Sequence, residues 1–392
     1  MNAIPRLKPY QGPAFLSYGF RPFFFLGACY AALVIALWLP VYEGEIALPG
    51  NFAPRDWHVH EMLFGYIAAV VTGFLLTAVP NWTGRLPLQG APLLILVVTW
   101  LAGRLAVAFS AKAGWVISGV IDCAFLVLVV GAVAREIIAG RNWRNLKVLI
   151  PVSVFALANI GFHAEAYAWG VADISIRLAI ATIVILITLI GGRIVPSFTR
   201  NWLARQSPGA LPAPFGRFDG AAIAFSAAAL GVWVVVPTGV STGVALLAAG
   251  SLQALRLGRW AGYRTSRDWL VLVLHVAYGF IPLGFVLLAL GAFDVVSPSA
   301  GLHAWMVGAA GTMTLAVMTR ASLGHTGRDL VAGPGTRAIY AAIVIAACAR
   351  TAAVLMPQWT FVLLHLGALA WLAAFGGFAL LYGPLLFQKR VS

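Results

Sequence analysis

The stretch WHVHEMLFGYIAAVVTGFLLTAVPNWTGR, residues 57–85, decides the fold of this chain. After a polar opening it continues through about 20 mostly apolar residues, enough to cross a bilayer as one helix. His58, His60 and Glu61 lie at the mouth of this apolar segment. Ionisable groups are costly in an apolar span and are retained mainly where they serve a function. The stretch therefore predicts a transmembrane helix with a functional site near one end.

The composition of the whole chain extends this prediction to the rest of the protein. Of its 392 residues, 61% are hydrophobic and only 10% are charged, and the mean hydropathy is +0.92. These values exclude an ordinary soluble globule and indicate a multi-pass protein surrounded by membrane lipid. The net charge of +14 comes from basic residues between apolar runs. Since no basic run has interleaved aromatic residues, we expect no nucleic-acid partner.

The apolar runs predict twelve transmembrane helices within a single transmembrane domain that covers residues 1–392. The fold class is therefore all-α, and prolines such as Pro40, Pro80 and Pro196 are expected to mark helix ends. The predicted helices cover residues 20–41, 59–80, 91–110, 114–137, 147–169, 173–196, 219–236, 239–256, 269–292, 302–321, 337–356 and 359–386.

The distribution of basic residues predicts the orientation of these helices. All but five of the 26 Lys and Arg residues fall on the side of the two termini. The positive-inside rule then makes both termini cytoplasmic. The exceptions, expected on the outer side, are Arg55, Arg104, Lys112, Arg177 and Arg350.

A weak internal repeat links the second and tenth helices. His60 precedes Arg85 by the same 25 residues that separate His303 from Arg328, and both segments end in TGR. The end of the sixth helix, PSFTR at 196–200, resembles PNWTG at 80–84 more loosely. The pattern fits three four-helix units.

The histidines sort by depth along the predicted helices. Five fall in the outer third, one in the inner third and one beyond the inner end. His303 and His325 are 22 residues apart, about 33 Å of helix, so they cannot bind one metal. We therefore predict a metal-rich outer layer and a second, inner centre. The outer group is His58, His60, His163, His303 and His365, and the inner pair is His275 and His325.

His58 and His60 can share a metal only if His58 still lies in the loop before the helix. Residues two apart on a regular helix point in nearly opposite directions. If both are helical, they serve different centres, or one binds a metal while the other holds a carboxylate or propionate. Glu61 and Glu165 are near enough in sequence to orient a ring or carry protons.

Other ionisable residues have both a functional and a structural interpretation. Asp122, within the fourth helix, is a candidate for proton transfer, or it pairs with an interior Arg or a hydroxyl. Arg193, Arg200 and Arg320 could bind haem propionates or anchor the inner helix ends. His365 has no motif around it, and an interfacial role is favoured for it.

Several of these segments closely resemble the NnrS family, in the right order over essentially the whole chain. They are GFRPFFFLG at 19–27, WHVHEMLFGY at 57–66, GFLLTAVPNWTGR at 73–85, GGRIVPSFTRNWL at 191–203, HVAYGFIPLG at 275–284 and GAAGTMTLAVMTRASLGHTGR at 308–328. The resemblance implies a bacterial inner-membrane protein of the nitric oxide response that contains haem b and copper. It also implies candidate ligands among the motif histidines, namely His58, His60, His275, His303 and His325, with His163 added.

Twelve helices and four-helix units also resemble haem–copper oxidases and nitric oxide reductases at the level of the fold. This chain departs from them because no helix carries a pair of adjacent histidines and the seventh helix has none. The resulting hypothesis is an oxidoreductase that reduces nitric oxide to nitrous oxide in nitrosative-stress defence or denitrification, using a quinol or small electron carrier. The alternatives are a haem-based nitric oxide sensor or sink, and a metal or small-solute transporter.

Overall fold

The computed structural model describes residues 10–206 and 208–390, and within them every regular element is a helix. Twelve helical segments of this part of the chain are long and apolar enough to cross a membrane. The predicted all-α fold is therefore confirmed. The segments are α1 (Phe20–Tyr42), α2 to α3 (Pro54–Thr83), α4 (Ala91–Ala108), α6 (Trp115–Ala139), α7 (Leu146–Trp169), α8 (Asp173–Leu203), α9 (Arg217–Val235), α10 (Val240–Gly258), α11 (Trp269–Ala292), α12 to α13 (Ser299–Thr326), α14 (Pro334–Leu355) and a last segment ending in α15 (Pro357–Phe387).

The second and tenth segments share an irregularity. Within the second, α2 (Pro54–His60) passes into a π-helical stretch, η2 (Glu61–Ile67), before α3 (Ala68–Thr83). Within the tenth, α12 (Ser299–His303) passes into a second one, η5 (Ala304–Gly311), before α13 (Thr312–Thr326). In both cases the π-helical stretch begins directly after a motif histidine. This shared position supports the repeat, which stays a prediction, and π-helical turns are frequent at functional sites.

Three prolines expected at helix ends lie inside helices instead. Pro40 lies within α1, Pro80 is followed by three more residues of α3, and Pro196 is followed by seven more of α8. Those assignments were wrong because transmembrane helices tolerate proline where neighbouring groups satisfy the freed backbone. Gly84, with a φ of 72°, ends α3 and donates its N–H to Pro80 O.

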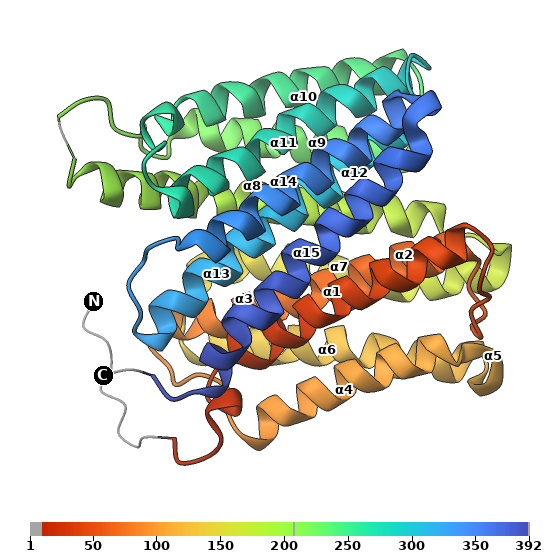
Figure 1. Cartoon of the computed structure of the whole chain (residues 1–392), viewed down its shortest axis with the longest axis horizontal. Helices are drawn as coiled ribbons and strands as arrows, with labels where there is room; N and C mark the ends of the chain where they lie inside the picture. Colours follow the sequence, from red (N-terminus) through yellow and green to blue (C-terminus); the bar gives the residue numbers. More distant parts are fainter. Residues whose placement is uncertain (1–9, 207, 391–392) are drawn as a thin grey trace. The chain divides into compact units, whose positions relative to one another are not determined.

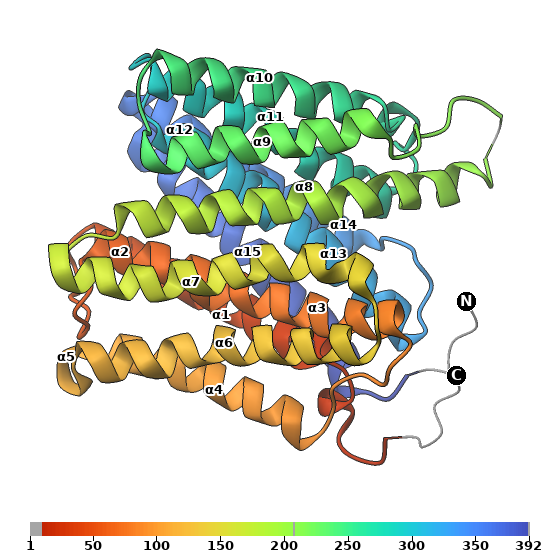
Figure 2. The ribbon, with the colours of Figure 1, turned by 180° about the vertical axis from the view of Figure 1, so that it is seen from behind.

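The described residues divide into two compact units. The first contains the helices up to α7 together with Ala321–Arg328 and the end of the chain from Phe378. Within it α4 packs on α6, α6 on α7, and α1 on α3 (Figures 1 and 2). The single transmembrane domain and its orientation stay predictions. Arg6 and Lys8, two of the residues that indicate the orientation, lie outside the described residues.

The second unit comprises Ile180–Arg320 and Asp329–Gly377, and α11 packs on α10, α12 and η5. Its interior holds a buried polar cluster around Arg256, whose side chain is fully buried. Arg256 Nε donates to Asp219 Oδ1 at 3.0 Å, and its Nη1 donates to Tyr278 OH at 2.9 Å. The cluster joins α9, α10 and α11 through charge-assisted hydrogen bonds.

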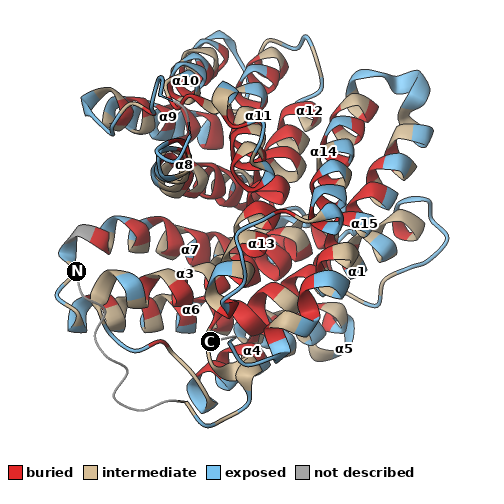
Figure 3. Cartoon of the chain, turned by 60° about the vertical axis from the view of Figure 1, so that its left-hand side comes forward, coloured by how far each residue is buried: buried red, intermediate tan, exposed pale blue. Residues whose placement is uncertain are grey.

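In each unit the helices bury one stripe of side chains and expose another (Figure 3). The exposed stripe is apolar: on α4, Ile95, Val98 and Leu105 are 54–61% exposed. A row of large exposed apolar side chains along a helix is unfavourable in water and suits contact with lipid. This pattern supports a multi-pass membrane protein.

Candidate metal centre

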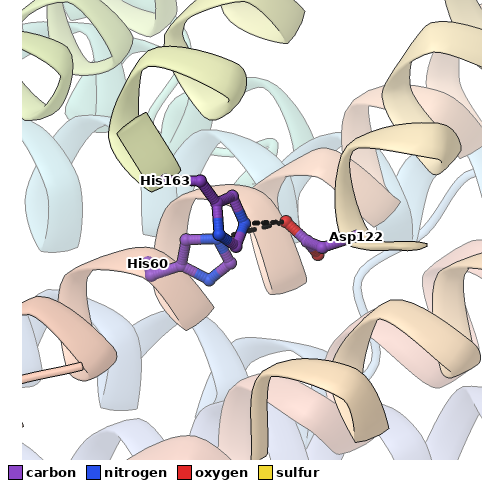
Figure 4. Close-up of side chains that lie close together, drawn as sticks. All are labelled: His60, Asp122 and His163. Atoms are coloured by element: carbon purple, nitrogen blue, oxygen red, sulfur yellow. Dashed lines mark hydrogen bonds and ion pairs between the residues drawn. The ribbon is translucent and has the colours of Figure 1, made fainter. Parts of the chain in front are cut away.

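Three side chains from different helices of the first unit converge on one point. His60 ends α2, Asp122 lies on α6 and His163 lies on α7 (Figure 4). Asp122 Oδ2 is 3.0 Å from His163 Nε2 and 3.2 Å from His60 Nε2. All three side chains are buried, and one donor atom from each lies within 4.8 Å of the others. Among the described residues this is the one group of three or more His, Cys, Asp or Glu side chains with such spacing.

Two glycines allow the helices to approach closely enough for this convergence. A Cβ at Gly103 on α4 would lie 2.9 Å from Asp122 Oδ1 and 3.1 Å from Asp122 Cα. A Cβ at Gly119 on α6 would lie 3.3 Å from the His163 ring. The first separation is shorter than any ordinary carbon contact. The centre therefore depends on small residues at helix–helix contacts, as is common in membranes.

The hydrogen bonds around His60 leave a place for a cation. Its Nδ1 lies 2.8 Å from Glu61 Oε1, so this nitrogen donates its proton to the carboxylate. Its Nε2 then faces two acceptors, Asp122 Oδ2 and Asn159 Oδ1, each at 3.2 Å. A lone pair on Nε2 would be repelled by these two oxygens. Nε2 must therefore carry a proton, which would be the second on the ring, or bind a metal ion. A carboxylate that fixes a histidine through its other nitrogen is the usual support of a metal ligand.

The charges nearby also favour a cation. Arg104 Nη1 donates to Glu61 Oε2 at 2.8 Å, and Arg104 Nη2 donates to Asp122 Oδ1. Tyr30 OH donates to the same Oε2 of Glu61. With neutral histidines, two carboxylates and one guanidinium leave one net negative charge in a buried place. An uncompensated buried charge is expensive, and either a second proton on His60 or a bound metal ion would compensate it.

Aromatic rings surround the remaining sides of the two histidines. Phe52, Phe64 and Phe162 have ring centroids 4.9–5.2 Å from that of His60. Phe52 also lies 5.3 Å from His163. These rings exclude water and lower the local dielectric constant, which strengthens every electrostatic interaction within the group.

The donor set itself fits a first-row transition metal. Two imidazole nitrogens with one carboxylate oxygen suit zinc, copper, iron or nickel. Bonds of about 2.0 Å to a tetrahedral ion put neighbouring donors about 3.3 Å apart, close to the 3.0 and 3.2 Å observed. The two imidazole nitrogens lie within 4.8 Å of each other, so the three donors are close enough to hold one metal ion.

The comparison with protein families matches residues 14–390 to the family described as NnrS protein. The chain belongs to the NnrS family. Membership fits a membrane protein of the nitric oxide response, and it confirms the resemblance carried by the motifs. A comparison with curated proteins found no match.

The remaining predicted residues of the first unit have other partners. His58 is helical, so it cannot share the metal of His60 as a loop residue would, and its ring stacks on Trp38 at 4.4 Å. The carboxylate of Glu165 accepts from the backbone N–H groups of Ile174 and Ser175 at 3.0 Å, and so caps the start of α8. The ring of His325 packs against those of Tyr18 and Phe20, at centroid distances of 5.7 and 5.4 Å.

The other predicted residues of this NnrS chain belong to the second unit. His275 Nε2 lies 2.8 Å from the Thr199 hydroxyl, which donates to Val195 O, so His275 is the donor of that bond. His303 and His365 each place Nδ1 within 2.9 Å of the backbone carbonyl four residues earlier. Arg193 is exposed, and the Arg320 guanidinium lies 4.1 Å from the centre of the Phe198 ring.

Three members of the centre were not singled out from the sequence. Arg104 was counted as an outer basic residue, but its side chain is buried against two carboxylates. Tyr30 and Asn159 are polar side chains within apolar helices and had no motif around them. A usable signal was present, because Arg104 and Asp122 each interrupt an apolar helix and a charge in a span needs a partner.

Proposed function

We propose that this NnrS-family protein is a haem- and copper-containing oxidoreductase of the bacterial inner membrane that consumes nitric oxide. The simplest reaction joins two molecules of nitric oxide with two electrons and two protons to give nitrous oxide and water. A quinol or a small carrier would supply the electrons. The buried His60–Asp122–His163 group is the observation that carries the proposal.

The residues of the group have distinct roles in this proposal. His60 and His163 would hold copper through Nε2 and Asp122 through Oδ2, and the bound metal would supply one-electron chemistry and a place for nitric oxide. Glu61 orients the His60 ring through Nδ1. Asn159 Nδ2 donates to Asp122 Oδ2 at 2.9 Å and restricts its rotation. The aromatic rings exclude water.

Protons would come through side chains that touch the centre. The Glu61 carboxylate contacts both His60 and the Tyr30 hydroxyl, so a proton held at Tyr30 can move to Glu61 over one hydrogen bond. Asp122 is proposed as a ligand instead of a proton carrier, since its Oδ2 lies beside the Nε2 atoms of both histidines while its Oδ1 accepts from Arg104.

Haem b is proposed for histidines with a fixed tautomer. His303 donates from Nδ1 to Ser299 O at 2.7 Å, which puts its lone pair on Nε2, the atom through which histidine usually binds haem. His275 has the opposite arrangement, and its buried Nδ1 has no hydrogen-bond partner within residues 10–206 and 208–390. Arg193 and Arg320 remain proposed partners of the propionates.

The experiment is turnover of purified, metal-replete protein with nitric oxide and a chemical electron donor. Nitrous oxide should form, and its yield should fall in His60→Ala and His163→Ala variants that retain haem. Absence of nitrous oxide with both metals bound would refute the reaction. Binding of nitric oxide without turnover would instead support a sensor or sink, and metal uptake into proteoliposomes would support a transporter.

A further inference from the structure

We propose that Phe52 controls access to the His60–Asp122–His163 group and restricts its ligand to small uncharged molecules. The inference rests on the proposed function in one respect, since it takes this group as the place where a ligand reacts. It adds the residue that selects the ligand and the face from which the ligand arrives.

Phe52 lies in the connection between α1 and α2 but is only 8% exposed. Its ring centroid is 5.1 Å from that of His60, 5.3 Å from His163 and 5.3 Å from Phe162. Phe64 and Phe162, the other rings against His60, are carried by η2 and α7. Of the three phenylalanine rings that contact His60, Phe52 is therefore the one carried by a connecting segment and not by a helix.

The backbone beside Phe52 is fixed. Asn51 N donates to Ser110 Oγ at 2.8 Å, and Asn51 Nδ2 donates to Ser110 O at 2.9 Å. Gly50 lies so close to α4 that a Cβ there would be 3.1 Å from Val107 O. On the other side, α2 begins at Pro54. Since the backbone on both sides is held, rotation of the Phe52 side chain is the movement that would open the route.

A series of aromatic rings leads from the surface to Phe52. Tyr167 is 68% exposed and lies 6.0 Å from Trp115, which is half-buried and lies 5.5 Å from Phe52. The positive-inside count predicts that this end of the unit faces outward. An ion would lose its hydration among these rings with little in return, whereas a small uncharged molecule would not. Nitric oxide belongs to the favoured class.

The first test uses metal-free protein and diethylpyrocarbonate, a small reagent that acylates accessible histidine. Peptide mass spectrometry would follow His163, because its Nε2 is paired with Asp122 and its Nδ1 keeps the lone pair that the reagent attacks. Phe52→Ala should raise the rate of His163 modification at least tenfold, and Phe52→Leu severalfold. Phe109→Ala is the matched control, because Phe109 directly follows α4 at the same end of the unit but is 48% exposed. It should react at the wild-type rate.

The second test uses metal-loaded protein with EDTA, a charged chelator, and with nitric oxide. In wild type the metal should be lost slowly to EDTA, and Phe52→Ala should accelerate this loss at least tenfold. Nitric oxide should bind quickly in both, which separates size and charge selection from general loosening. If Phe52→Ala does not fold, Phe52→Leu decides the matter by the same measurements.

Equal modification and equal metal loss in the Phe52 variants and wild type would overturn the role of Phe52. Failure of the proposed function has a different signature, since metal-loaded wild-type protein would then form no nitrous oxide from nitric oxide, whatever the Phe52 variants do. The diethylpyrocarbonate result would still decide the access route, because it needs no metal.

Discussion

Replacement of Arg104 by methionine tests whether the buried charges hold the first unit together. The guanidinium is 6% exposed, and its two carboxylate partners, Glu61 and Asp122, are no more than 1% exposed. Removing one member of such a buried ionic group leaves charge uncompensated and costs about 3–5 kcal/mol. Since membrane or soluble domains of this size have only about 5–15 kcal/mol of stability, the loss should be large.

The assay is an unfolding titration in mixed micelles, followed by near-ultraviolet circular dichroism. Arg85→Gln is the matched control because it removes an ion pair of the same chemistry, to Glu136 at 2.6 Å, from a side chain that is 45% exposed. Exposed pairs contribute about 0–1 kcal/mol. The Arg104→Met variant should therefore lose at least twice as much free energy of unfolding as Arg85→Gln.

A triple variant sharpens this prediction. Adding Glu61→Gln and Asp122→Asn to Arg104→Met removes the uncompensated charges, and most of the lost stability should return. Equal stability of Arg104→Met and Arg85→Gln, or a triple variant less stable than the single one, would refute the charged network on which the metal argument depends.

Three further predictions concern single residues of the first unit and their matched controls. His163→Ala should lower the affinity for the outer metal by more than about 100-fold, beyond the loss typical of supporting residues, whereas His365→Ala should retain it by metal analysis. Gly103→Ala, whose new methyl would lie 2.9 Å from Asp122 Oδ1 and 3.1 Å from Asp122 Cα, should cost about 1–3 kcal/mol and weaken metal binding by displacing Asp122; Gly131→Ala, with nothing within 4 Å among the described residues, should do neither in the same titrations. Glu165→Ala should lower stability by about 1 kcal/mol through the lost helix cap and leave nitrous oxide production unchanged; a large fall in turnover would support the proton role instead.

The positions of the membrane spans could be predicted because hydropathy depends on each segment alone. The predicted starts and ends fall within a few residues of the observed helices, apart from the second, tenth and sixth, which extend further. The second begins at Pro54, five residues before its predicted start. Because of that difference, His58 lies within α2, and its side chain points in nearly the opposite direction from that of His60.

The partners of His60 could not be predicted in the same way. Asp122 and His163 were each recognised as candidates, but 62 and 103 residues separate them from His60 in the sequence. Their meeting depends on how α2, α6 and α7 pack, and helix periodicity carries no information about it. Arg104 was misplaced for a related reason, since the positive-inside rule treats every basic residue as a loop anchor and does not ask whether a carboxylate lies beside it.

The π-helical stretch after His60 has a consequence for how such a centre can arise. Each residue of an α-helix advances about 100° around the axis. One residue more or less in Glu61–Ile67 would therefore turn His60 about a quarter of a circle relative to the packed face of α3. A helix could thus acquire or lose its metal ligand through an insertion or deletion of one codon, with every core residue of α3 unchanged. The same event in Ala304–Gly311 would redirect His303, so the two halves of the chain could diverge in what they bind without diverging in fold.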